Sequence, residues 1–89
     1  MNIRIPDDVL WSEVGDDVVL LNLASGNYFG LDGVAARIWS LIVAQTSTDE
    51  ILSTIGHEYE VDLDRARQDL DALVKDLTQE GLITLDSGR

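Results

Sequence analysis

The stretch "GNYFGLDGVAARIW", residues 26–39, contains the change from strand to helix on which the fold depends. The aromatic pair in its first half favours a strand, and Gly26 suits the turn that comes before it. Its second half has the apolar spacing of a helix, and Asp32 stands where a helix N-cap is expected. We therefore expect a short strand from Tyr28 to Asp32, followed by a helix that begins near Gly33.

Two further strands are predicted upstream of this stretch. Residues 9–14, "VLWSEV", partly alternate between apolar and polar and are rich in strand formers. Residues 18–23, "VVLLNL", form a nearly continuous apolar run, which predicts a strand covered on both faces. The connections "GDD" and "ASGN" are short, so the three strands are expected to form an antiparallel meander.

Three helices are predicted downstream. The first runs from Gly33 to about Ala44, and the second opens with the capping box Ser47 to Glu50 and continues to about Tyr59. The third runs from Leu63 to Glu80, between an N-cap at Asp62 and a terminating Gly81. Residues 82–85 predict a brief extended tail. Helical spacing predicts these inward residues: Val34, Ile38, Trp39, Leu41 and Ile42; Ile51, Leu52, Ile55 and Tyr59; Leu63, Ala66, Leu70, Leu73, Val74 and Leu77.

Segregated strands and helices predict an α+β fold in which a three-stranded antiparallel sheet precedes three helices. The arrangement is typical of a winged helix-turn-helix. A chain of 89 residues accommodates one domain, with strands over about residues 9–32 and helices over about 33–80.

Charge and composition exclude several classes of function. Seventeen acidic against six basic residues give a net charge of −11, which repels phosphate backbones and argues against a nucleic-acid partner. The same field would attract a basic peptide, but the surplus of acidic residues is equally explained by a need for solubility alone. No apolar run approaches the roughly 18 residues that a membrane span needs. The N-terminus does not resemble an export signal, so a cytoplasmic protein without a membrane partner is expected.

Residues for catalysis or metal binding are scarce. The chain has no cysteine, and its single histidine, His57, lies near the end of the second predicted helix. The many carboxylates fall in polar turns or on solvated helix faces, where nothing tunes them for acid–base work. The glycine-bearing turns lack the pattern of a phosphate-binding loop. We therefore expect no enzyme activity, no metal and no cofactor.

The segment "VVLLNLASGNYFGLDGVAARIWSLI" resembles the PqqD-like family, the peptide-recognition elements of ribosomal peptide biosynthesis. The resemblance rests on Val18 to Asn22, the run "YFGLD", Ile38-Trp39 and the ending "EGLI", and it covers about residues 8–85. The complete form "YFGLDGVAARIW" is most similar to the stand-alone version from lasso-peptide gene clusters.

The resemblance implies a non-catalytic adaptor. It implies that the leader of a precursor peptide joins the sheet beside the third strand and packs against the third helix. It also implies delivery of the peptide to a cysteine-protease-like leader peptidase and an ATP-dependent macrocyclase. Leaders in such systems usually carry a Tyr-x-x-Pro motif that enters an apolar pocket. The alternative is a winged-helix interaction or regulatory domain that binds no leader, and both a monomer and a strand-swapped dimer remain open.

An edge strand offers unpaired backbone groups to a visiting chain, and the third predicted strand has neither proline nor lysine to block it. Alternation places Tyr28 and Gly30 on one face, and Gly30 removes a side chain where a second backbone would come close. The other interpretations are that Phe29 and Leu31 are core residues, that Gly30 is a simple bulge, and that Leu70 and Val74 are core. The predicted peptide-binding residues are Asn27, Tyr28, Phe29, Gly30, Leu31, Arg67, Leu70, Asp71 and Val74.

Overall fold

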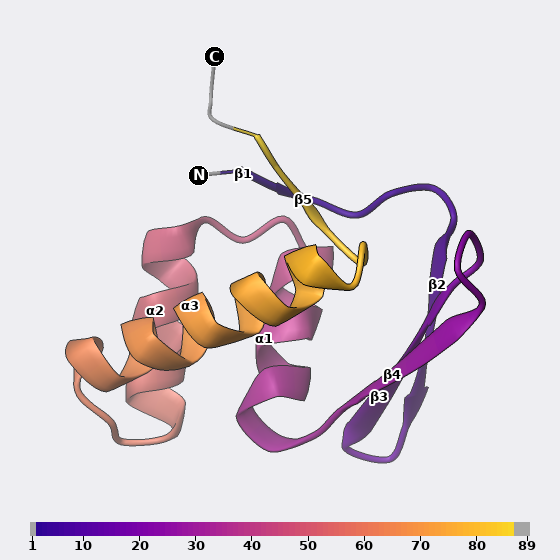
Figure 1. Cartoon of the computed structure of the whole chain (residues 1–89). Helices are drawn as coiled ribbons and strands as arrows, with labels where there is room; N and C mark the ends of the chain where they lie inside the picture. Colours follow the sequence, from indigo (N-terminus) through magenta and orange to yellow (C-terminus); the bar gives the residue numbers. More distant parts are fainter. Residues whose placement is uncertain (1, 87–89) are drawn as a thin grey trace.

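A three-stranded antiparallel sheet and three helices form the two layers of the computed structural model, which describes residues 2–86 (Figure 1). The strands are β2 (Val9–Val14), β3 (Asp17–Asn22) and β4 (Asn27–Leu31), in the spatial order β2-β3-β4. The predicted meander and the α+β class are therefore confirmed, with strand bounds within one residue of those expected.

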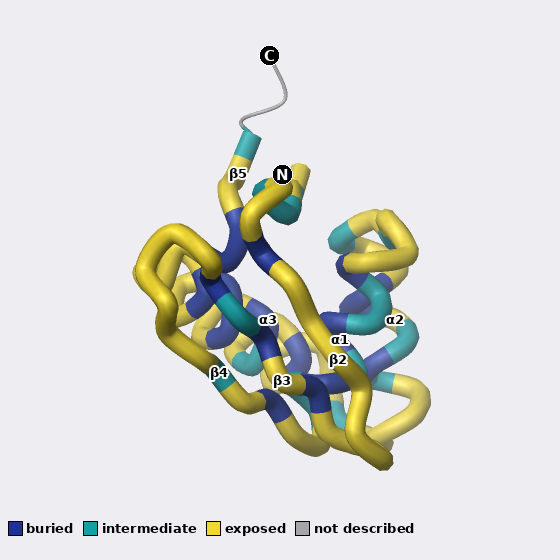
Figure 2. The backbone as a smooth tube through the Cα atoms, turned by 90° about the vertical axis from the view of Figure 1, so that its right-hand side faces the viewer, coloured by how far each residue is buried: buried dark blue, intermediate teal, exposed yellow. Residues whose placement is uncertain are grey.

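The sheet is buried on one face only. Val18 and Leu20 of β3 are buried against the helices, whereas Val19 between them keeps 37% of its surface exposed. Figure 2 shows the resulting alternation of buried and exposed residues along β3. The expectation that this strand is covered on both faces is wrong, because all three helices lie on the same side of the sheet (Figure 1). Leu23, which the apolar run included, lies exposed in the turn after β3.

The helices are α1 (Gly33–Val43), α2 (Thr48–Glu58) and α3 (Leu63–Gln79). Two of the predicted caps form: the Ser47 hydroxyl accepts from the Glu50 N–H at 3.2 Å, and Asp62 accepts from the Arg65 N–H at 2.9 Å. Asp32 occupies the N-cap position of α1, but its side chain makes no capping hydrogen bond. Asp32 has the extended backbone that is usual at an N-cap, and the chain then enters α1 through Gly33, whose φ is +55°.

The core lies between the sheet and the helices and is centred on Trp39, whose ring meets that of Trp11 in a T-shaped contact with centroids 5.5 Å apart. The predicted apolar stripes line this core with two exceptions. Leu63 is 64% exposed and Tyr59 is also exposed. Both lie at helix ends, where the chain has not yet reached, or has already left, the packed layer.

The two ends of the chain pair with each other. β1 (Asn2–Arg4) runs antiparallel to β5 (Thr84–Asp86) in a separate two-stranded sheet. The extended tail was expected from the sequence, whereas β1 was not, because its pairing joins segments about eighty residues apart. Gly81, with a φ of +71°, turns the chain from α3 towards this tail as predicted.

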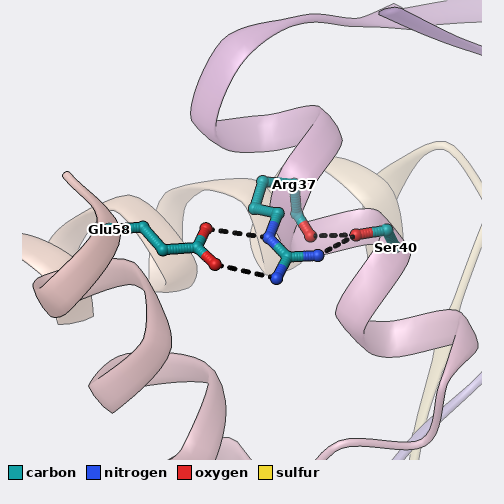
Figure 3. Close-up of polar contacts among 3 residues, drawn as sticks. All are labelled: Arg37, Ser40 and Glu58. Atoms are coloured by element: carbon teal, nitrogen blue, oxygen red, sulfur yellow. Dashed lines mark hydrogen bonds and ion pairs between the residues drawn. The ribbon is translucent and has the colours of Figure 1, made fainter. Parts of the chain in front are cut away.

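A polar contact joins α1 to α2 (Figure 3). Two guanidinium nitrogens of Arg37 donate to the two carboxylate oxygens of Glu58 at 2.8 and 2.9 Å, and a third donates to the Ser40 hydroxyl at 3.2 Å. The hydrogen bond from Arg37 holds the pKa of Glu58 below its ordinary value and raises the pKa of Arg37.

Within residues 2–86, no helix combines the length and apolarity required to cross a membrane.

Candidate functional site

β4 is an edge strand of the sheet, and its last residue leads directly into α1. β4 pairs with β3 along one side, and no strand within residues 2–86 lies along its other side. Its five residues include neither proline nor lysine, the residues that commonly protect such edges. The predicted edge position of this strand is confirmed, and a free edge of this kind is able to pair with a further strand.

The residues of β4 divide between the two faces of the sheet. Leu31 is buried against the helices and Phe29 is half-buried beside the same core, which confirms the core interpretation of Leu31. Tyr28, which is 73% exposed, and Gly30 face outwards. Gly30 pairs in continuous register with Val19, so the interpretation of Gly30 as a bulge is wrong. Asn27 opens the strand opposite Asn22 and is exposed.

A cavity of about 380 Å³ opens where β4 ends, between the first turns of α1 and the side of α3. Its apolar walls are formed by two core residues, Ile38 and Leu73. Its charged rim is formed by Arg65 and Asp69, with Nε of Arg65 3.4 Å from Oδ1 of Asp69. The lining residues are Asp32, Gly33, Val34, Ala35, Ile38, Arg65, Asp69, Ala72 and Leu73. An apolar cavity beside a free strand edge suits an extended peptide that inserts a side chain as it pairs.

The α3 residues predicted for the site lie elsewhere on the helix. Leu70 and Val74 are only 1% and 7% exposed, so the interpretation of both as core residues is confirmed. Asp71 and Val74 contribute to a second hollow of about 410 Å³, on the flank of α3 that faces Leu85 of β5. Arg67 is exposed on α3. The cavity near the end of β4 is therefore lined by α3 residues other than the four that were predicted for the site.

Four α3 residues that line the cavity were not predicted from the sequence as site residues: Arg65, Asp69, Ala72 and Leu73. The spacing of Arg65, Asp69 and Ala72, at i, i+4 and i+7, shows that they share one side of α3. Spacing alone does not reveal which flank of an amphipathic helix faces β4. That depends on the rotation of α3 about its axis, which the packing of the core sets.

Asn22 fixes the position of the hairpin relative to α3. Its side-chain amide donates to the carbonyl oxygens of Glu80 and Gly81 at 3.0 and 3.5 Å, at the C-terminal end of α3. Its side-chain oxygen accepts from the backbone N–H groups of Ala24 and Ser25 at 2.9 and 3.4 Å. Asn22 is the only buried polar residue in the described part of the chain. It therefore ties the turn between β3 and β4 to the helix that walls the cavity.

The site offers backbone pairing and an apolar cavity. Within residues 2–86, no cluster of three or more His, Cys, Asp or Glu residues is arranged to hold a metal ion. The arrangement is suited to non-covalent capture of an extended segment.

Comparisons with known proteins agree with this geometry. The family model described as coenzyme PQQ synthesis protein D (PqqD) matches residues 17–83. TbiB1, solved in complex with the TbiA(beta) leader peptide, is 38% identical and has a TM-score of 0.86; the match covers 97% of this chain and 96% of TbiB1. A lasso peptide synthetase B1 complexed with a leader peptide is 27% identical and has a TM-score of 0.87, over 96% of this chain and 100% of that one. A search of curated proteins found no match.

Proposed function

Because this chain belongs to the PqqD family, we propose that it is a non-catalytic adaptor that binds the leader segment of a ribosomally made precursor peptide. The observation that carries the proposal is the free edge of β4 beside the cavity between α1 and α3. The two similar structures, both solved with leader peptides, support the same function for this chain.

In the proposed complex the leader adds a fourth strand beside β4. Each ladder hydrogen bond contributes about 0.5–1.5 kcal/mol net, and burial of a large apolar side chain in the cavity contributes about 1.5–3 kcal/mol. Backbone pairing discriminates little between sequences, so the cavity supplies most of the selectivity. The leader loses conformational freedom on binding, which offsets part of these gains.

The proposed contacts combine two elements. On β4 they are the predicted residues Asn27, Tyr28, Phe29, Gly30 and Leu31, and on α3 they include Arg65, Asp69, Ala72 and Leu73. Leu70 and Val74 support the wall from within the core. A role for Arg67 and Asp71 requires the leader to continue across the exposed surface of α3, because Asp71 lines the hollow on the far flank.

We place the adaptor in the lasso-peptide branch, since one of the similar structures is a lasso peptide synthetase B1. There it would present the leader to a cysteine-protease-like leader peptidase and an ATP-dependent macrocyclase in the cytoplasm. A regulatory winged-helix domain, the alternative, predicts that no leader binds.

Titration of a labelled TbiA(beta) leader peptide into the protein tests the proposal, with fluorescence anisotropy as the readout. We expect saturable binding. Peptides N-methylated at one backbone amide each should lose affinity at every second position, because alternate N–H groups of an added strand face β4. Absence of binding would reject the adaptor function. Binding without the two-residue period would reject strand addition as its mode.

A further inference from the structure

Gly30 is the one glycine within residues 2–86 that the fold itself does not explain. It lies in regular strand pairing with Val19, and a Cβ atom built on it would meet nothing within 4 Å. An ordinary strand residue would fit there and would lower the conformational freedom of the unfolded chain. The remaining glycines have structural reasons: Gly15, Gly26, Gly33 and Gly81 have positive φ, and a Cβ on Gly56 would lie 3.2 Å from the Val61 carbonyl oxygen.

The missing side chain of Gly30 leaves a bare strip of backbone on the outer face of the sheet, next to the free edge. Val19, on the neighbouring strand β3, borders the strip and is partly exposed. Tyr28, two residues earlier on the same strand and face, borders it on a second side. Because a side chain at position 30 would point outwards, glycine there leaves the backbone edge unchanged. What it opens is space above the sheet, bordered by an aliphatic and an aromatic side chain.

We propose that Gly30 is the floor of a subsite that receives a large apolar side chain from the outer face of the bound leader. The inference rests on the strand addition described above. Side chains along an added strand point alternately to the two faces of the sheet. If some leader side chains point inwards to the cavity, their neighbours in the leader must point outwards. Side chains of directly adjacent strands lie about 4.5–5.5 Å apart at Cβ, so the leader residue opposite Gly30 stands directly beside it. Only a large side chain there would extend across the glycine to Val19, which lies one strand further on. A large side chain laid over a strand glycine covers its exposed backbone, an arrangement that stabilises sheets in general.

The subsite also changes the role first predicted for Gly30. The sequence suggested that glycine lets a second backbone approach, but the orientation of β4 assigns the space to a side chain instead. The leader is then recognised from both faces of the sheet, through the cavity on the helical side and through Gly30 on the outer side.

The test compares Gly30→Val and Gly30→Thr with the wild-type protein, using thermal unfolding and titration with the TbiA(beta) leader peptide. Both variants should melt at or above the wild-type temperature, because β-branched residues suit an exposed strand. Both should bind the leader about tenfold more weakly, the ratio expected when one partly buried apolar contact is lost. Ser12→Val is the matched control, since Ser12 pairs with Val19 from the opposite side, on β2. It adds the same side chain to the same face and should leave binding unchanged.

An alanine scan of the leader completes the test. Wild-type protein should show one outward position at which alanine weakens binding about tenfold, and Gly30→Val should bind that alanine peptide no worse than the parent peptide. Unchanged affinity of Gly30→Val and Gly30→Thr would overturn the subsite. Saturable binding with a two-residue N-methyl period would still stand in that case, so failure of the subsite is distinguishable from failure of the adaptor function.

Discussion

Asn22 shows how one side chain positions the candidate site. All of its polar groups are used: the amide joins two carbonyl oxygens at the end of α3, and the oxygen closes the turn that leads to β4. The distance between the free edge of β4 and α3 therefore depends on a residue that lies on neither element. The sequence places Asn22 within the family pattern, but its partners at residues 80 and 81 become evident only in three dimensions.

Asn22→Asp should destabilise the protein by about 1–3 kcal/mol, because it removes both donors to α3 and sets a buried carboxylate against two carbonyl oxygens. Urea unfolding near neutral pH measures the loss. Asn27→Asp, an identical change at the exposed residue opposite Asn22, serves as the control and should cost much less. Equal losses in the two variants would show that the buried hydrogen bonds do not hold the hairpin to the helix.

The Arg37–Glu58 pair predicts a defined pH dependence. Its hydrogen bond lowers the pKa of Glu58 from an ordinary value of 4.5, so the folded protein favours the ionised carboxylate. The resulting stability is present above the unfolded-state pKa and is lost as pH falls through the lowered folded-state value. The melting temperature of the wild-type protein should therefore be higher than that of Glu58→Gln at neutral pH. This difference should vanish in strong acid. Glu13→Gln, at an exposed position of β2, controls for the charge change alone. A difference that does not depend on pH would contradict the expectation.

At the scale of elements, sequence patterns predicted what local interactions decide. The capping residues Ser47 and Asp62 marked two helix starts correctly because their hydrogen bonds reach only three residues along the chain. The exposure of the outer face of β3 and the pairing of β1 with β5 were not predicted. Both depend on which elements from distant parts of the sequence pack beside these strands. The edge position of β4 was predictable from strand order, whereas the flank of α3 that lines the cavity was not.

Variants on the two flanks of α3 should affect leader binding differently. Ala72 is exposed on the rim of the cavity, so Ala72→Gln should partly fill it and weaken leader binding at least tenfold. Asp71→Ala alters the opposite flank and, as an exposed charge, should change affinity by less than about fivefold. Glutamine and alanine both suit helices, so both variants should keep the wild-type melting temperature. A larger effect from Asp71→Ala would move the proposed path of the leader across α3 to that flank.

At the scale of the whole molecule, the net charge of −11 acts on every approaching partner. Such a field steers basic peptides during diffusion, and salt screens it over about 10 Å at 0.1 M. The strand edge and the cavity make short-range contacts that salt affects little. Charge and contact geometry therefore govern different steps: the field governs how fast a leader arrives, and the site governs how long it stays.

Two versions of the TbiA(beta) leader, extended at one end by three lysines or by three glutamates, separate these steps. At low salt the lysine version should associate about tenfold faster or more, because the field of the acidic protein attracts it and repels the glutamate version. As salt rises to about 0.5 M, the two association rates should converge, since the screening length falls to a few ångströms. The dissociation rates should stay similar throughout, because the added residues lie outside the paired strand. Stopped-flow fluorescence measures both rates. Equal association rates at low salt would show that the acidic surface does not steer the leader and that its surplus of carboxylates serves solubility alone.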